Sequence, residues 1–248
     1  MDFVQNKSME NNNKNYVTFG LILGLSLIIS TGLGVFAFYK IRSVDYISTT
    51  GSAKKAVVSD KVKWTSSITR QVSVSTVKDG YAKMDIDLKE VKDFFTANEI
   101  PAESLSISPV FMNEIWDNNN QTEKKYNLVQ NFEVQSSDVQ KIDALAKNTN
   151  SLINKGVLFS TNSLEYYYSK LPAVRVKLLA NAVADAKARA EQLAIAGGKK
   201  IGVLKSASSG VVQVIAPNSV DVSDYGMYDT SKIEKEIMVT VKASFEIK

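Results

Sequence analysis

The 248-residue chain contains neither cysteine nor histidine. Without cysteine it can form no disulfide, no thiolate nucleophile and no zinc–thiolate site. Without histidine it lacks the commonest general base, the Ser-His-Asp triad and the usual protein ligand of transition metals. We therefore expect neither a metal centre nor a cofactor site.

An excess of charge of either sign is also missing. Lys and Arg number 30 against 26 Asp and Glu, which gives a formal net charge of +4, and no basic run resembles a nucleic-acid-binding stripe. We expect no nucleic acid partner. The remaining chemistry is that of carboxylates, and Asp85 with Asp87, or Glu90 with Asp93, could serve as paired acids in glycoside hydrolysis. A helix over residues 76–97 would place all four on or beside its polar face, so a hydrolase is the least favoured reading and we expect no enzyme.

One long stretch, residues 17–39, has no charged side chain at all. As a helix it would be about 34 Å long at ~1.5 Å per residue, enough to cross the hydrocarbon layer of a bilayer. A cleaved signal peptide has a shorter apolar core and a small-x-small cleavage site, so we predict an uncleaved signal-anchor over residues 17–39 behind a disordered leader, residues 1–16. The lipid bilayer is the predicted partner. Gly20 and Gly24, four residues apart, would let two such helices pack closely.

The remaining chain, residues 44–248, shows the patterning of one α+β domain. Alternating apolar residues predict strands at 62–74, 105–111, 126–134, 157–166, 202–205, 211–216 and 236–247, arranged as mixed or antiparallel sheets. Three main helices are predicted between them: residues 76–97, a helix capped by Ser137 or Asp138 and stopped by Gly156, and a long one between Pro172 and Gly197.

Two details of this pattern concern packing. The long alanine-rich helix is predicted to face the core with Val176, Leu179, Val183, Ala186, Ala190 and Leu193. Arg70 interrupts the apolar face of the first strand, and we expect it near a strand end or an interface.

The strongest candidates for binding are aromatic. Tyr166, Tyr167 and Tyr168 are consecutive, and with Trp116 they could line a peptide- or sugar-binding face. The alternative, which we favour, is that some of these rings pack into the core while the others cover a subunit interface.

Several segments resemble the SIMPL-domain family, envelope proteins of bacteria that include a periplasmic immunogenic protein and an oxidative-stress-defence-like protein. The likeness is strongest at residues 180–190, ANAVADAKARA, and continues to Gly197 and to Ile201-Gly202-Val203. Gly51, Asp60 and Lys155-Gly156-Val157 resemble further elements of the family, and the likeness covers residues 44–248.

The resemblance implies an α+β domain that faces the periplasm or the cell exterior, and large ring- or cage-like homo-oligomers. It implies no established reaction. Counting Lys and Arg around the apolar segment leans slightly toward a cytoplasmic carboxyl side, but the rule is weak for long domains. We therefore expect a single-pass protein of the inner membrane with a periplasmic domain that acts as a self-assembling scaffold with a link to stress, or alternatively as a ligand-binding or stress-sensing module. The sequence names no protein partner.

Overall fold

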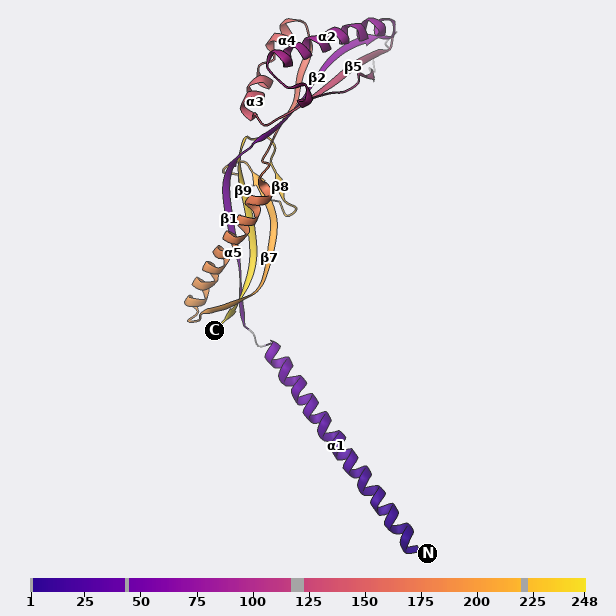
Figure 1. Cartoon of the computed structure of the whole chain (residues 1–248), viewed down its shortest axis with the longest axis vertical. Helices are drawn as coiled ribbons and strands as arrows, with labels where there is room; N and C mark the ends of the chain where they lie inside the picture. Colours follow the sequence, from indigo (N-terminus) through magenta and orange to yellow (C-terminus); the bar gives the residue numbers. More distant parts are fainter. Residues whose placement is uncertain (1, 43–44, 117–122, 220–222) are drawn as a thin grey trace. The chain divides into compact units, whose positions relative to one another are not determined.

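The structure is a computed structural model that describes residues 2–42, 45–116, 123–219 and 223–248 (Figure 1). It has an α+β fold with two sheets, as the pattern predicts. The chain divides into two compact units. One comprises the chain up to Thr49 with Lys187–Ala207 and Ala243–Lys248, and the other comprises Thr50–Ala186 and Ser208–Lys242.

The first element is the helix α1, Asp2–Arg42. Its segment Tyr16–Lys40, 25 residues with a mean hydropathy of 2.3, is the one helix in the described chain that is long and apolar enough to cross a membrane. That property is shared by membrane anchors and signal sequences. α1 begins within the leader that the sequence predicts to be disordered, because extending an existing helix costs far less than nucleating one.

The five-stranded sheet is built around β2, Lys61–Ser73. Strand β2 pairs antiparallel with β5, Lys125–Ser136, and with β6, Phe159–Tyr167. On the other side of β5 the sheet continues with two short strands. The sequence predicted one strand at 105–111, but the strand is interrupted before Phe111. They are β3, Leu105–Ile107, and β4, Phe111–Ile115, and both pair antiparallel with β5.

Three helices pack against this sheet (Figure 1). They are α2, Val77–Ala97, α3, Val139–Lys147, and α4, Asn150–Asn154; the sequence predicted α3 and α4 as one helix. Short 3₁₀ turns, η1 at Val74–Thr76 and η2 at Ala102–Ser104, precede α2 and β3. Trp64 lies at the centre of the core, edge-on to Phe95 and Phe159 at centroid distances of 5.5 and 5.9 Å.

Arg70 and Asp87 form one pair, and Asp87 corrects an expectation. Arg70 lies three residues before the end of β2, as expected, and its guanidinium donates to both carboxylate oxygens of Asp87 at 2.6 and 2.7 Å, and to the carbonyl of Gly156 at 3.1 Å. Asp87 is only 3% exposed, so it does not belong to the polar face of α2. A bidentate pair supplies the partner without which a buried carboxylate would be too costly.

The second sheet contains four strands in the order β1-β9-β7-β8. They are β1, Tyr46–Val58, β9, Glu234–Ile247, β7, Ile201–Ile215, and β8, Met227–Tyr228. The predicted alternation of β9 is confirmed, with Ile237, Val239, Val241, Ala243 and Phe245 all buried. The two strand signals at 202–205 and 211–216 belong to the single strand β7.

The helix α5, Leu171–Ala196, buries a face that is shifted from the predicted one, and the two faces share Ala186 and Ala190. Its buried residues are Val174, Leu178, Ala182, Ala186, Ala190 and Ala194, whereas Val176 is 68% exposed and Leu193 is 56% exposed. The reason is Gly51 on β1, where an added Cβ would lie 2.2 Å from the Ala182 carbonyl oxygen and 2.3 Å from the Ala186 nitrogen. Only an alanine face allows this close approach, so small side chains face inward in place of larger ones.

Two further contacts fix α5. The Asp185 carboxylate accepts the backbone N–H of Ser52 at 2.8 Å. Just before the helix, the Asp60 carboxylate accepts the N–H and the hydroxyl of Ser169, both at 2.7 Å. Gly51, Asp60 and Asp185, which carry the sequence resemblance, therefore all act on the placement of α5.

Candidate functional site

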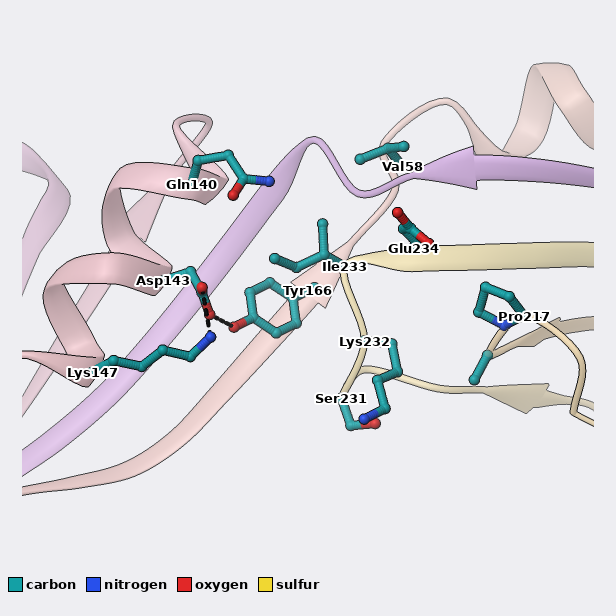
Figure 2. Close-up of a pocket in the computed structure, with 11 residues that line it drawn as sticks. Val58, Gln140, Asp143, Lys147, Tyr166, Pro217, Ser231, Lys232, Ile233 and Glu234 are labelled. Carbon is teal, nitrogen blue, oxygen red and sulfur yellow. Dashed lines mark hydrogen bonds and ion pairs between the residues drawn. The ribbon is translucent and has the colours of Figure 1, made fainter.

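A cavity of about 540 Å³ lies between α3, β6 and the segments around Pro217 and Lys232 (Figure 2). This volume is within the range of small-molecule sites. The apolar part of its lining consists of Val58, Pro217, Ile233 and the ring of Tyr166. The polar groups of the lining come from Gln140, Asp143, Lys147, Ser231, Lys232 and Glu234. All of these residues belong to the same compact unit.

Asp143 joins the polar groups on one wall of the cavity. Its carboxylate accepts the Tyr166 hydroxyl at 2.5 Å and the Lys147 ammonium at 2.7 Å (Figure 2). Helix α3 can present Asp143 and Lys147 together because they are four residues apart, and its first turn is capped by Asp138, which accepts the N–H of Lys141.

These contacts set the protonation of the wall. Burial alone would raise the pKa of Asp143, but the hydrogen bonds from Lys147 and Tyr166 outweigh it and lower the pKa below its ordinary value of 3.8. Burial, and then the hydrogen bond to Asp143, raises the pKa of the Tyr166 hydroxyl well above 10. At neutral pH Asp143 is thus ionised and Tyr166 protonated, and because the Tyr166 proton is donated to Asp143, the oxygens of this pair can only accept hydrogen bonds from a ligand.

A buried lysine shapes the opposite wall. Lys235 is 0% exposed, and its ammonium donates to the backbone carbonyls of Asp229 and Lys232 and lies 5.7 Å from the ring centroid of Tyr228. The segment that includes Ser231 and Lys232 therefore folds around this cation. Burial lowers the pKa of Lys235, and the Asp229 carboxylate works against that change.

The structure does not bring the three consecutive tyrosines to one face. Of the three tyrosines, only Tyr166 lines the cavity. Tyr167 donates its hydroxyl to Glu165 at 2.5 Å, which together with burial raises its pKa to about 12, and it lines a separate hollow beside Lys61 and Lys63. The backbone N–H of Tyr168 donates to the Tyr228 hydroxyl at 2.8 Å.

The other candidates lie elsewhere. Trp116 follows β4 and is 87% exposed. Gly20 and Gly24 lie on α1 with no neighbouring atom within 4 Å of an added Cβ. Of the proposed carboxylate pairs, Asp87 is taken up by Arg70 and Glu90 pairs with Lys155 at 2.6 Å. In the part of the chain that the structure describes, no group of three or more acidic side chains is placed to hold a metal ion.

Sequence reasoning did not find Asp143, Lys147 or Lys235. Spacing alone could have flagged the first two as neighbours on one helix face. Lys235 lies two and four residues before the inward residues Ile237 and Val239, so the alternation of β9 predicts that its side chain also faces inward.

Comparison with known proteins identifies the domain. The family model described as "SIMPL: Protein of unknown function (DUF541)" matches residues 47–245. No curated protein matches the chain.

Proposed function

The chain belongs to the SIMPL family, and on that premise we propose that it is a membrane-anchored, extracytoplasmic protein of the cell envelope whose domain self-assembles into a homo-oligomeric scaffold. Helix α1 supports the anchor, since its segment Tyr16–Lys40 is long and apolar enough to cross a membrane and lies shortly before the start of β1. An inner-membrane location, a periplasmic domain and a link to stress all belong to this proposal.

The observation that carries the assembly is the edge of the five-stranded sheet at β4. Among the described strands β4 pairs only with β5, so its other edge has no strand beside it. Phe111 and Met112 on β4 and Trp116 after it are large apolar residues exposed to solvent. The one charged residue on β4, Glu114, is paired with Lys124 at 3.0 Å. Natural edges are usually protected by free charges, bulges or covering segments, and an exposed apolar edge favours pairing with another chain. We take that chain to be a second copy.

Placing a charge on this edge should reduce assembly. We expect the full chain in detergent to form multiples of its 27.3 kDa mass at micromolar concentration, measured by mass photometry with the detergent contribution subtracted. Phe111→Lys should weaken self-association by roughly tenfold, which corresponds to about 1.4 kcal/mol, because a lysine at the pairing edge loses hydration when another chain covers it. Ile86→Lys, at an exposed position on α2, is the matched control. A strictly monomeric wild-type chain, or equal effects of the two substitutions, contradicts the proposal.

A second candidate is a ligand-binding module, and the cavity beside Tyr166 favours it. Its volume, apolar lining and fixed Asp143–Tyr166 pair are features of a small-molecule site. The donors and acceptors on its rim suit a small polar compound such as a dipeptide or a sugar.

This candidate is tested by filling the cavity. Amino acids, dipeptides and monosaccharides are screened by thermal unfolding of the full chain in detergent. A ligand present at ten times its Kd should add about 1.4 kcal/mol, which raises the Tm by roughly 3–5 °C. Ala216 also lines the cavity. Ala216→Trp should therefore fill it and abolish this shift, whereas Ala216→Ser should retain the shift. A panel that raises no Tm, or a shift that survives Ala216→Trp, removes the support for a ligand here.

A further inference from the structure

Four chain segments meet at one end of the compact unit that contains the start of β1. Lys200, before β7, and Lys248, after β9, exchange two backbone hydrogen bonds of 3.0 and 2.8 Å. The N–H of Ile247 donates to the carbonyl of Asp45, directly before β1, at 3.0 Å. The end of α5 joins this group through the turn at Gly198, with φ +70°, where Lys199 N–H donates to the Ala194 carbonyl at 2.8 Å.

The surface of this end combines apolar and cationic side chains. Tyr46, Leu193 and Ile195 are exposed, and so are Lys199, Lys200 and Lys248. The segments at this end contain four lysines and two acidic residues, Asp45 and Glu246, within residues 45–46, 193–205 and 243–248. Glu246 forms an ion pair with Lys205 at 3.5 Å. Aliphatic and tyrosine side chains beside lysines make up the composition of protein surfaces that rest on lipid headgroups.

The covalent chain limits where this end can be. Asp45 follows Arg42, the last residue of α1, by three residues, and a fully extended chain covers about 11 Å over that length. If α1 crosses a bilayer, Asp45 and the segments hydrogen-bonded beside it remain within reach of the headgroup layer. A second copy of the chain fits this surface less well, because the excess of lysines would repel itself.

We propose that this end, formed by Tyr46, Leu193, Ile195, Lys199, Lys200 and Lys248, is a second membrane contact, which docks on anionic headgroups of the bilayer that α1 enters. The inference rests on the anchor in the proposed function. It adds that the domain lies against the lipid surface and does not turn freely on its tether.

The native absence of cysteine makes a depth measurement direct. A single nitroxide is attached to the full chain at Ala196→Cys, beside the proposed contact, or at Ser160→Cys, an exposed position on β6 in the other unit. The chain is placed in nanodiscs of phosphatidylcholine with phosphatidylglycerol. We expect the label at residue 196 to be at least threefold less accessible to a water-soluble nickel reagent than the label at residue 160. Lys199→Glu/Lys200→Glu should abolish the difference, and so should nanodiscs of phosphatidylcholine alone.

The alternative outcomes are distinct. If the chain stays in the nanodisc and both labels are equally accessible to the nickel reagent, the proposed membrane contact is wrong, but the membrane anchor is not contradicted. Protection that persists in phosphatidylcholine, after charge reversal, or in detergent without lipid assigns the contact to other groups or to another protein chain, and also overturns it. A chain that leaves the nanodisc altogether overturns the anchor together with the contact.

Discussion

Replacing Asp87 by alanine is expected to lower the free energy of unfolding by about 3–5 kcal/mol, because it leaves the Arg70 guanidinium without its partner inside the sheet-and-helix core. Asp87 accepts from Nε and Nη2 of that guanidinium, and the Gly156 carbonyl, which accepts from Nη2 at 3.1 Å, is neutral. The Arg70 side chain is 27% exposed and is therefore partly hydrated, so we expect the loss of unfolding free energy to fall toward the lower end of this range.

The measurement is urea unfolding of the full chain in detergent, followed by the fluorescence of the buried Trp64. Asp85→Ala, two residues away on the exposed side of α2, is the control and should change stability by no more than about 0.5 kcal/mol. Replacing both partners, as Arg70→Met with Asp87→Leu, should recover most of the loss because no buried charge remains. An Asp87→Ala chain as stable as the Asp85→Ala chain would refute the role given to this pair.

Replacing Gly51 by alanine should cost about 3 kcal/mol, the upper end of what one inserted methyl group usually costs in a packed core. Its Cβ would lie 2.2 Å from the Ala182 oxygen and 2.3 Å from the Ala186 nitrogen, and both atoms belong to the backbone of α5. No rotamer change can relieve such a contact, so the helix must move away from β1. That movement would also lengthen the hydrogen bond between Ser52 N–H and the Asp185 carboxylate, 2.8 Å in the native chain.

Thermal unfolding of the full chain checks this, with Ser52→Ala as the neighbouring control, since Ser52 uses its backbone in the contact with Asp185. Adding Ala186→Gly to Gly51→Ala should restore little stability, because the obstructing atoms are not those of the Ala186 side chain. A loss below 1 kcal/mol, or full rescue by that second change, would show that α5 is not held at its present distance by the glycine.

The sequence predicted well those parts of the fold that depend on periodicity. Strand β9 alternates cleanly, and its inward residues, from Ile237 to Phe245, are all buried as expected. The same holds for Val62, Trp64, Ile68 and Val72 on β2. The resemblance to the SIMPL family, based on Gly51, Asp60 and the alanine-rich segment, is confirmed by the family match over residues 47–245.

Prediction failed where a contact between distant segments decided the outcome. The inward side of α5 depends on Gly51, more than a hundred residues earlier in the chain. Asp87 stands at helical spacing from the buried residues Met84 and Val91, so a helical wheel places it on the inward face of α2. The prediction set it among solvated residues because it is charged, and its burial depends on the partner Arg70 in another element. The cavity beside Tyr166 likewise draws on α3, β6 and residues near Pro217, which no local pattern connects.

The packing of α5 has a consequence for how this protein can vary. The larger aliphatic residues Val176, Leu193 and Ile195 are outside, while the inner side from Ala182 to Ala194 consists of alanines. A survey of substitutions along this helix would find that folding tolerates polar residues at these outer aliphatic positions and does not tolerate larger side chains at the inner alanines. The hydropathy of the sequence would therefore misjudge which substitutions the helix accepts. A more soluble version of the chain is best sought by placing a polar residue at Val176, an apolar side chain that faces solvent.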